Sequence, residues 1–179
     1  MVTAQTIVTA QNIVHDAYQL WGVPYRPWQP GDSIPMWLDD GPYMDAFLNA
    51  GHEHGLAELR SHLQDVGVMG SDLINFALIA NRLYEVGGGT GTYADYLVNT
   101  SPFDPSSPGQ VGAIALRPYQ DPDDQGSIAL YVDPHRLIQS IPSEGVTDRY
   151  TDQETYSWAS EGYPSYGFTI YGFLPGVSY

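Results

Sequence analysis

Apolar residues recur at helical spacing in the first half of the chain and mark several helices there. Between Thr6 and Trp21 they fall at every third or fourth position, which predicts an amphipathic helix that Gly22 ends. Ser71 is a suitable N-cap for a longer helix, with Asp72 favourably placed in its first turn. Together these signals predict helices over 6–21, 43–50, 56–66, 71–86 and 93–98, with breaks at Gly51 and Gly55.

After residue 110 the apolar runs become short and are separated by turn-forming residues. Runs of this kind, bounded by Asp, Pro and Gly, are typical of β-strands. A capping box at Thr151–Glu154 predicts one more helix over 152–160. The strands are predicted over 111–117, 127–132, 136–141 and 168–173, after a Pro- and Ser-rich loop over 99–109. This order predicts an α+β fold, with N-terminal helices packed on a C-terminal antiparallel sheet.

Length and composition fit one folded domain over residues 1–179. The chain is 42% hydrophobic, enough for a sizeable core. No run approaches the roughly 20 apolar residues of a membrane-spanning helix. The first residues lack the basic start and apolar block of a secretory signal, so synthesis in the cytoplasm is expected. Because the chain has no Cys, a disulfide framework is excluded.

The chain is strongly acidic, with a net charge of -15 at pH 7. Such a charge repels phosphate backbones and anionic lipids, so neither nucleic acid nor a membrane is expected as a partner. The 14 Tyr allow two interpretations. The favoured one is that many are half-buried at the edges of a β-rich core, and the other is that they contact protein partners.

A Pro-rich stretch follows the first predicted helix, over residues 24–42. Four aromatic residues lie in or beside it: Trp21, Tyr25, Trp28 and Trp37. Because Pro limits the entropy of the unfolded chain, this stretch is expected to be an ordered loop held by aromatic packing.

The five His were considered as metal ligands and as catalytic bases. His52 and His54 have His-x-His spacing, and His62 follows, but this matches no strong metal motif. These three are therefore expected to be surface residues in a loop or helix break. His15 is expected to be half-buried in the first helix, and His135 to be solvated in a turn. No metal and no cofactor are predicted.

Two loops resemble ligand-binding motifs only in part. Asp121–Gly126 begins like a calcium loop, but its twelfth position is Val132 instead of the required Glu, so a solvated turn is expected. Gly87–Thr92 is rich in Gly, but it follows a helix and lacks Lys, so a flexible connection is expected instead of a phosphate loop.

Ser71 is the one candidate nucleophile that the sequence offers at a helix start. A Ser hydroxyl is a weak nucleophile without an adjacent base. N-capping alone accounts for Ser71, and this is the favoured interpretation.

Four segments together resemble the NlpC/P60 cell-wall peptidases. Gly70–Phe76 is similar to the family's Asp-Cys-Ser-Gly-Leu-Val segment, and Tyr18–Tyr25 to its Tyr-x-Trp-Gly-Gly segment. Pro108–Ala115 is similar to its Pro-Gly-Asp-Leu strand, and Ser127–Val132 to its His-Val-Gly-Ile-Tyr-Val strand. The resemblance runs in order over most of the chain, with an insertion at about 26–68.

The resemblance implies a papain-like fold whose catalytic positions have changed. The family's Cys falls on Gly70, the Ser that follows it on Ser71, and the His on Ser127. Gln139, 12 positions after Ser127, fits the family's third polar residue. The family works by a thiolate that attacks a peptide carbonyl while His moves the proton. A chain without both groups is expected to be a non-catalytic, degenerate member of the family.

The family occurs in wall hydrolases, phage lysins and phage tail components. The resemblance therefore implies a minor tail or tail-tip structural protein of a phage, located in the virion, with other tail proteins as partners in a symmetric assembly. One alternative is a peptidoglycan peptidase or endolysin module that uses Ser71 as an atypical nucleophile. Another is a module that binds cell-wall peptides without cutting them.

Overall fold

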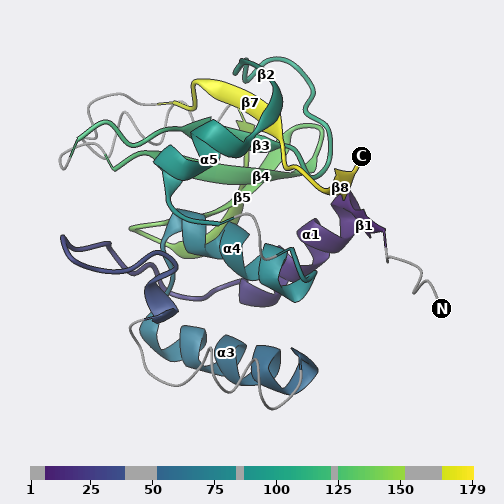
Figure 1. Ribbon diagram of the computed structural model, residues 1–179. Helices are drawn as coiled ribbons and strands as arrows, with labels where there is room; N and C mark the ends of the chain where they lie inside the picture. The colour runs from purple at the N-terminus through teal and green to yellow at the C-terminus, as the bar shows by residue number, and fades with distance from the viewer. Residues whose placement is uncertain (1–6, 39–51, 84–86, 122–124, 152–166) are drawn as a thin grey trace.

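The protein has an α+β architecture, which confirms the predicted fold class (Figure 1). The computed structural model describes residues 7–38, 52–83, 87–121, 125–151 and 167–179. Its helices in these ranges are α1 (Ala10–Ala17), α3 (His52–Val66), α4 (Gly70–Ala80) and α5 (Thr90–Tyr96), with 3-10 turns η1 (Tyr18–Leu20) and η2 (Met36–Leu38). None of the helices in the described part of the chain is long and apolar enough to span a bilayer.

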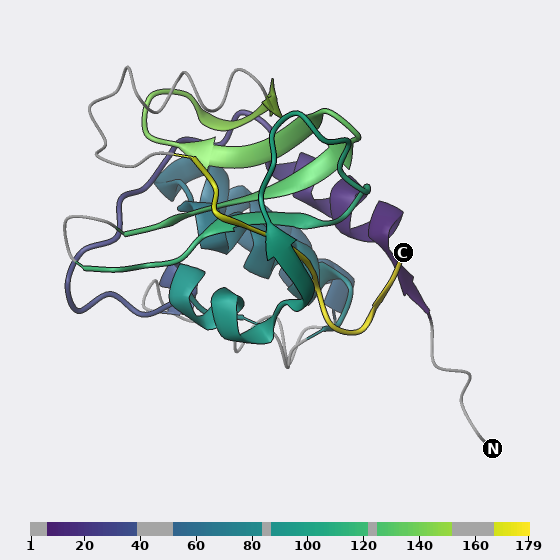
Figure 2. The ribbon, with the colours of Figure 1, turned by 90° about the horizontal axis from the view of Figure 1, so that it is seen from above.

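An antiparallel sheet of six strands forms the centre of the fold, in the order β2-β7-β3-β4-β5-β6. Its strands are β2 (Val98–Pro102), β3 (Ile114–Arg117), β4 (Ser127–Asp133), β5 (Arg136–Ile141), β6 (Gly145–Tyr150) and β7 (Ile170–Phe173). A separate parallel pair joins β1 (Val8–Thr9) to β8 (Val177–Ser178). Figure 2 shows from above how the sheet lies across the helical layer.

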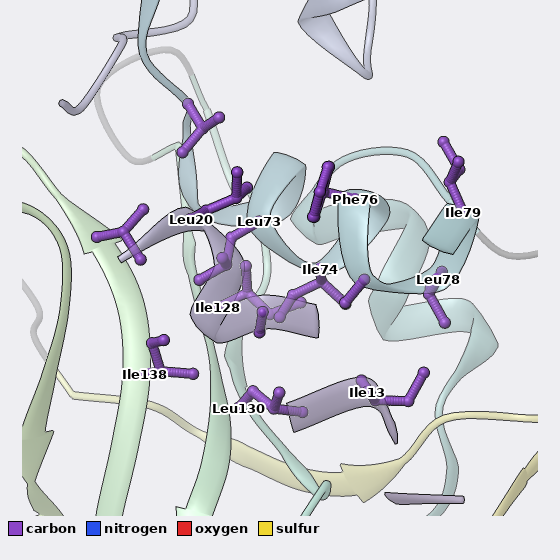
Figure 3. Close-up of a cluster of buried hydrophobic side chains, with 14 of the residues drawn as sticks. Ile13, Leu20, Leu73, Ile74, Phe76, Leu78, Ile79, Ile128, Leu130 and Ile138 are labelled. Atoms are coloured by element: carbon purple, nitrogen blue, oxygen red, sulfur yellow. The ribbon is translucent and has the colours of Figure 1, made fainter. Parts of the chain in front are cut away.

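One face of the sheet packs on α1 and α4. Alternation along the strands turns every second residue toward these helices. Figure 3 shows the resulting cluster of side chains from α1, α4, β4 and β5. Its buried members include Ile13, Leu20, Leu73, Ile74, Phe76, Leu78, Ile128, Leu130 and Ile138. Hydrophobic burial of this size is the main stabilising contribution to the fold.

The other face of the sheet is buried by aromatic side chains. The intervening residues of the same strands form this second cluster, with Ala129 and Tyr131 on β4 and Leu137 on β5. Tyr131 meets Tyr171 edge to face, with ring centroids 5.7 Å apart. The central strands β3, β4 and β5 are therefore buried on both faces.

Helix α4 is buried nearly all round, since every residue from Ser71 to Ile79 is buried. It lies between the sheet and α3, which Figure 1 shows on the side of α4 away from the sheet. Leu59 and Leu63 of α3 join the same core cluster. A helix with apolar residues on every side is typical of such a central position.

The first helix is shorter than its apolar pattern predicts, because it begins at Ala10 instead of residue 6. Thr9 is its N-cap, and the capping box joins the Thr9 side chain to the N–H of Asn12 and the Asn12 side chain to the N–H of Thr9. Val8 and Thr9 pair with β8 in extended conformation, so they cannot continue the helix. The helix tightens into η1 after Ala17.

Three other helix boundaries differ from prediction. Helix α3 starts at His52 and runs through Gly55, which is buried and does not break it. Helix α4 ends at Ala80, before the predicted residue 86, and Arg82 follows with a φ of 61°. Helix α5 begins at Thr90, so the second half of the predicted flexible connection over 87–92 is helical. The predicted helices over 43–50 and 152–160 lie outside the described residues.

Three of the predicted strands are confirmed at nearly the predicted bounds, as β3, β4 and β5. The predicted last strand is also present and is shorter, as β7. The predicted loop over 99–109 is wrong in its first part, because β2 occupies residues 98–102 and pairs with β7. Strand β6 was not predicted, because polar residues occur among both its odd- and its even-numbered positions and no apolar alternation marks it. It forms an edge of the sheet.

The Pro-rich stretch is tied to the rest of the fold by backbone contacts near β5. The N–H of Val68 donates to the carbonyl of Pro24, and the N–H of Arg26 donates to the carbonyl of Val68. The Ser140 hydroxyl on β5 donates to that same Val68 carbonyl at 2.7 Å. A Cβ at Gly67 would lie 2.7 Å from the Pro24 carbonyl oxygen, so this approach requires Gly. The segment before α4 is thereby fixed against the sheet.

Candidate functional site

A cleft of about 920 Å³ opens beside the N-terminus of α4. It is lined by the first residues of α4 and α5, the end of β3 and the start of β4. The loop after Val23, called the aromatic loop below, adds Tyr25 and Trp28 to the lining. The volume of the cleft lies in the range of pockets that hold drug-sized ligands.

Two of the positions that the resemblance singles out, Gly70 and Ser127, both line this cleft. A Cβ built at Gly70 would lie 3.4 Å from Cγ2 of Ile128 and 3.5 Å from its carbonyl oxygen, which are ordinary contacts. The start of α4 therefore faces the start of β4, and Gly70 leaves space where a side chain would fit. Gly70 and Ser127 therefore do not supply the nucleophile and the base that a peptidase would need.

Ser71 lies inside α4 and not at its N-cap, so the predicted capping role is wrong. The N-cap is Met69, which makes no side-chain capping bond. Ser71 is the second residue of the helix and is 1% exposed. Although Ser71 belongs to the lining of the cleft, its hydroxyl has no hydrogen-bond partner in the described part of the protein.

Gln139 is fully buried and does not belong to the cleft lining. Ile138 pairs with Leu130, so alternation along β4 and β5 places Gln139 on the same face as Ala129 and Ser127. Both polar atoms of its amide lack a hydrogen-bond partner among the described residues. Gln139 therefore lies on the sheet face turned away from α4, and no hydrogen bond joins it to Ser127 among the described residues.

Asp72 follows the lining residues Gly70 and Ser71 on α4 and does not itself line the cleft. Sequence reasoning placed it only in the first turn of this helix. It is 1% exposed, and both its carboxylate oxygens accept from the N–H of Met36 at 3.3 Å. Burial raises the pKa of Asp72 from 3.8 to about 7, although bonds from Met36 and Asn75 and the charge of Arg26 favour the ionised form. Asp72 therefore changes its charge near neutral pH.

A buried hydrogen-bond network joins α4 to α5 beside the cleft. The Tyr93 hydroxyl donates to Oδ1 of Asn75 at 2.7 Å, and the Asn75 amide donates to the Gly88 carbonyl at 3.1 Å. Burial raises the pKa of Tyr93 well above its ordinary value, so Tyr93 stays neutral. The Thr90 hydroxyl donates to the Gln125 carbonyl at 3.0 Å and fixes the start of α5 to the β3–β4 connection.

All five His lie in the described part of the chain, and none of them belongs to the cleft lining. His15 is exposed on α1 beside Asp16, so its predicted half-burial is wrong. His52 and His54 lie in helix α3 and not in a loop. His52 Nε2 is 2.8 Å from the Ala80 carbonyl oxygen. His135 is exposed in the turn between β4 and β5, as predicted.

The charge of the cleft lining differs from that of the whole chain. The chain carries 21 Asp and Glu against six Arg, yet no Asp or Glu is among the described residues that line the cleft. Arg117, at the end of β3 and 5% exposed, is in the lining. Tyr25, Trp28 and Tyr119 contribute aromatic surface.

No protein-family model matches the chain, and no curated protein is significantly similar to it in sequence.

Proposed function

We propose that this chain is a non-catalytic protein of the NlpC/P60-like, papain-like type, in which the peptidase cleft persists without its nucleophile and base. The observation that carries the proposal is that Gly70 and Ser127 both line one cleft. The sequence resemblance puts the family's thiol at one of these positions and its imidazole at the other.

The environment of Ser71 argues against the alternative of a peptidase that uses it as nucleophile. Its hydroxyl is buried inside the first turn of α4, and no His lies among the described residues that line the cleft. A Ser hydroxyl without a base is a poor nucleophile. Incubation with purified peptidoglycan is expected to release no new amino termini, and release that Ser71→Ala abolishes would contradict the proposal.

The proposed setting is a phage particle, with the chain as a minor tail or tail-tip structural protein. The resemblance supports this setting, because the family includes tail components and this cleft has lost the groups needed for cutting. Tyr96, Tyr119 and Tyr150 expose large side chains that suit protein contacts. The test is mass spectrometry of purified particles of the encoding phage. The chain should be present at a copy number that matches the symmetry of the tail, and its absence from the particles would exclude this role.

A second candidate function, the binding of cell-wall peptides without cutting, is favoured by the open volume of the cleft. A ligand that binds only the folded state raises the melting temperature by an amount that grows with the logarithm of its concentration above Kd. Muropeptides should raise the melting temperature without being cleaved if this candidate is correct.

Restoring the two missing groups tests the proposed architecture directly. Gly70→Cys places a thiol at the N-terminus of an 11-residue helix, and the helix dipole lowers the pKa of such a thiol below about 8.5. Adding Ser127→His should lower it further by forming a thiolate–imidazolium pair. Because the chain has no other Cys, the rate of iodoacetamide alkylation against pH reports this thiol alone.

Ser101→Cys, on the exposed strand β2, is the matched control and should show an ordinary thiol pKa. A double variant whose alkylation profile equals that of Gly70→Cys alone would show that positions 70 and 127 do not form the expected pair. That result would remove the basis for the NlpC/P60-like assignment.

A further inference from the structure

One wall of the cleft is formed by the residues that lead into the turn η2. Ile34, two residues before η2, lines the cleft. Its Cδ1 would lie 3.0 Å from a Cβ at Gly89, the N-cap of α5, so this side chain contacts the start of that helix. Met36, the first residue of η2, donates its N–H to the carboxyl of Asp72 in the first turn of α4. The segment from Ile34 to Met36 therefore contacts both helix starts beside the cleft.

Three buried polar groups lie on the two segments that meet at this contact. The indole N–H of Trp37 on η2 and the hydroxyl of Ser71 on α4 have no hydrogen-bond partner in the part of the chain that the structure describes. The Asp72 carboxyl is 1% exposed, and its two bonds from the Met36 N–H are long, at 3.3 Å. Burying polar groups without water or close partners costs free energy. The polar groups therefore oppose the contact between η2 and α4.

Apolar packing keeps η2 in place against this cost. Met36 is 2% exposed and Trp37 is fully buried, and the Trp37 ring belongs to the main core cluster. The closed arrangement is therefore the stable one. A displacement that only admits water between Met36 and Asp72 exposes less apolar surface than unfolding of the whole domain, so it requires less free energy.

The groups that face Asp72 from the surrounding elements do not offset its burial. Arg26 of the aromatic loop acts on it through its charge, and the N–H of Met69 and the amide of Asn75 donate to it. Tyr93 faces it from α5 and stays neutral. Burial outweighs these favourable interactions and raises the pKa of Asp72 to about 7. Any arrangement in which water reaches this carboxyl is therefore favoured once the carboxyl is ionised.

We propose that η2 is a pH-dependent gate of the cleft: ionisation of Asp72 loosens the contact of Met36 with α4, and Ile34 moves away from the start of α5 with it. At low pH the carboxyl is neutral and the gate is closed. A solvated Asp72 binds its proton less tightly than a buried one, so a rise in pH favours the open arrangement. The cleft then widens on the side of Ile34. The gate concerns the wall of the cleft and holds whether or not the NlpC/P60-like assignment is correct.

Amide hydrogen exchange of the full chain, followed residue by residue by NMR at about pH 5 and about pH 8, tests the gate. The Met36 N–H is the reporter, because its acceptor is Asp72 itself. Its protection factor, the ratio of the intrinsic to the observed exchange rate, should fall about hundredfold between these pH values. Leu130, fully buried at the centre of the sheet, reports unfolding of the whole domain. The Met36 N–H should be less protected than the Leu130 N–H at both pH values.

Asp72→Asn removes the ionisable group and keeps an acceptor for the Met36 N–H. In this variant the protection factor of Met36 should be nearly the same at both pH values. Asp95→Asn, at an exposed position of α5, is the matched control and should keep the hundredfold fall. If Asp72→Asn does not fold, the comparison of Met36 with Leu130 in the natural protein still decides the outcome.

Ile34→Ala tests whether the wall of the cleft moves together with η2. Loss of the Ile34 contact with the start of α5 should lower the protection factor of Met36 roughly fivefold or more at both pH values and leave its pH dependence unchanged. Ile7→Ala, at a position that is 74% exposed, is the control and should leave the Met36 protection factor unchanged.

Three results would overturn the proposal. Equal protection of Met36 and Leu130 at both pH values would mean that η2 opens only when the domain unfolds. A Met36 protection factor that does not change with pH in the natural protein would mean that Asp72 does not release η2. An unchanged Met36 protection factor in Ile34→Ala would separate the wall of the cleft from η2. None of these results bears on the thiol test of the fold assignment.

Discussion

Asp72→Asn is expected to remove most of the pH dependence of folding stability between about pH 4 and pH 7. Over this range the natural protein is expected to lose up to roughly 4 kcal/mol of stability as the pH rises. The carboxyl of Asp72 is buried under the backbone of Met36, and burial raises its pKa from 3.8 to about 7. In the unfolded chain the same carboxyl titrates near its ordinary value. The two states therefore bind different numbers of protons between these two pKa values.

The direction of the effect follows from proton binding. Between pH 4 and pH 7 the folded protein holds a proton on Asp72 that the unfolded chain has lost, so stability falls as the pH rises. Above pH 7 both states are ionised, and the full cost of the buried charge is present. An amide at position 72 keeps an acceptor for the Met36 N–H and carries no charge at any pH.

Urea denaturation at a series of pH values between about 4 and 8 measures this effect, as the difference in free energy of unfolding between variant and natural protein. Asp95→Asn, on an exposed position of α5, makes the same chemical change without burial and should give a difference that varies little with pH. If the free energy of unfolding of Asp72→Asn differs from that of the natural protein by the same amount at every pH in this range, Asp72 is ionised or solvated throughout.

Gln139→Met is expected to stabilise the protein by about 1–3 kcal/mol, which corresponds to a rise of several degrees in melting temperature. Gln139 is fully buried on β5, and neither its amide oxygen nor its amide nitrogen has a partner in the described part of the protein. Met has a similar length and brings no polar atoms that need hydrogen bonds. The substitution therefore removes the cost of burying an unsatisfied amide while it keeps the packing beside Ala129.

Calorimetric melting of the variant measures the change, and Gln64→Met on the exposed side of α3 is its control. The control should shift the melting temperature little, since the Gln64 side chain is already solvated. A lower melting temperature for Gln139→Met would mean that the amide has a hydrogen-bond partner in solution and contributes to stability.

The burial of Gln139 and of Asp72 illustrates what the sequence could not reveal. Apolar spacing identified β4 and β5 at almost their observed bounds, because alternation of buried residues is a local property of a strand. The resemblance also paired Gly70 with Ser127, and both line the cleft. Whether a polar residue on these elements finds a partner depends on segments far away in sequence, such as the Met36 turn over Asp72.

The boundaries of helix α4 were wrong for a related physical reason. Its nine buried residues face the sheet, α1 and α3 on different sides, so no polar stripe marks where the helix meets solvent. Ser71 therefore resembles an N-cap in sequence, although Met69 takes that position. The edge strand β2 escaped prediction because all five of its residues are exposed and carry no apolar alternation.

The hydrogen bond between Tyr93 and Asn75 has a consequence for how anything enters the cleft. It ties α5 to α4, and the first residues of both helices line the cleft. Spreading them would expose a buried phenol and amide, so the aperture is rigid on this side. Any ligand must therefore fit the separation of these two helix starts as the folded core sets it.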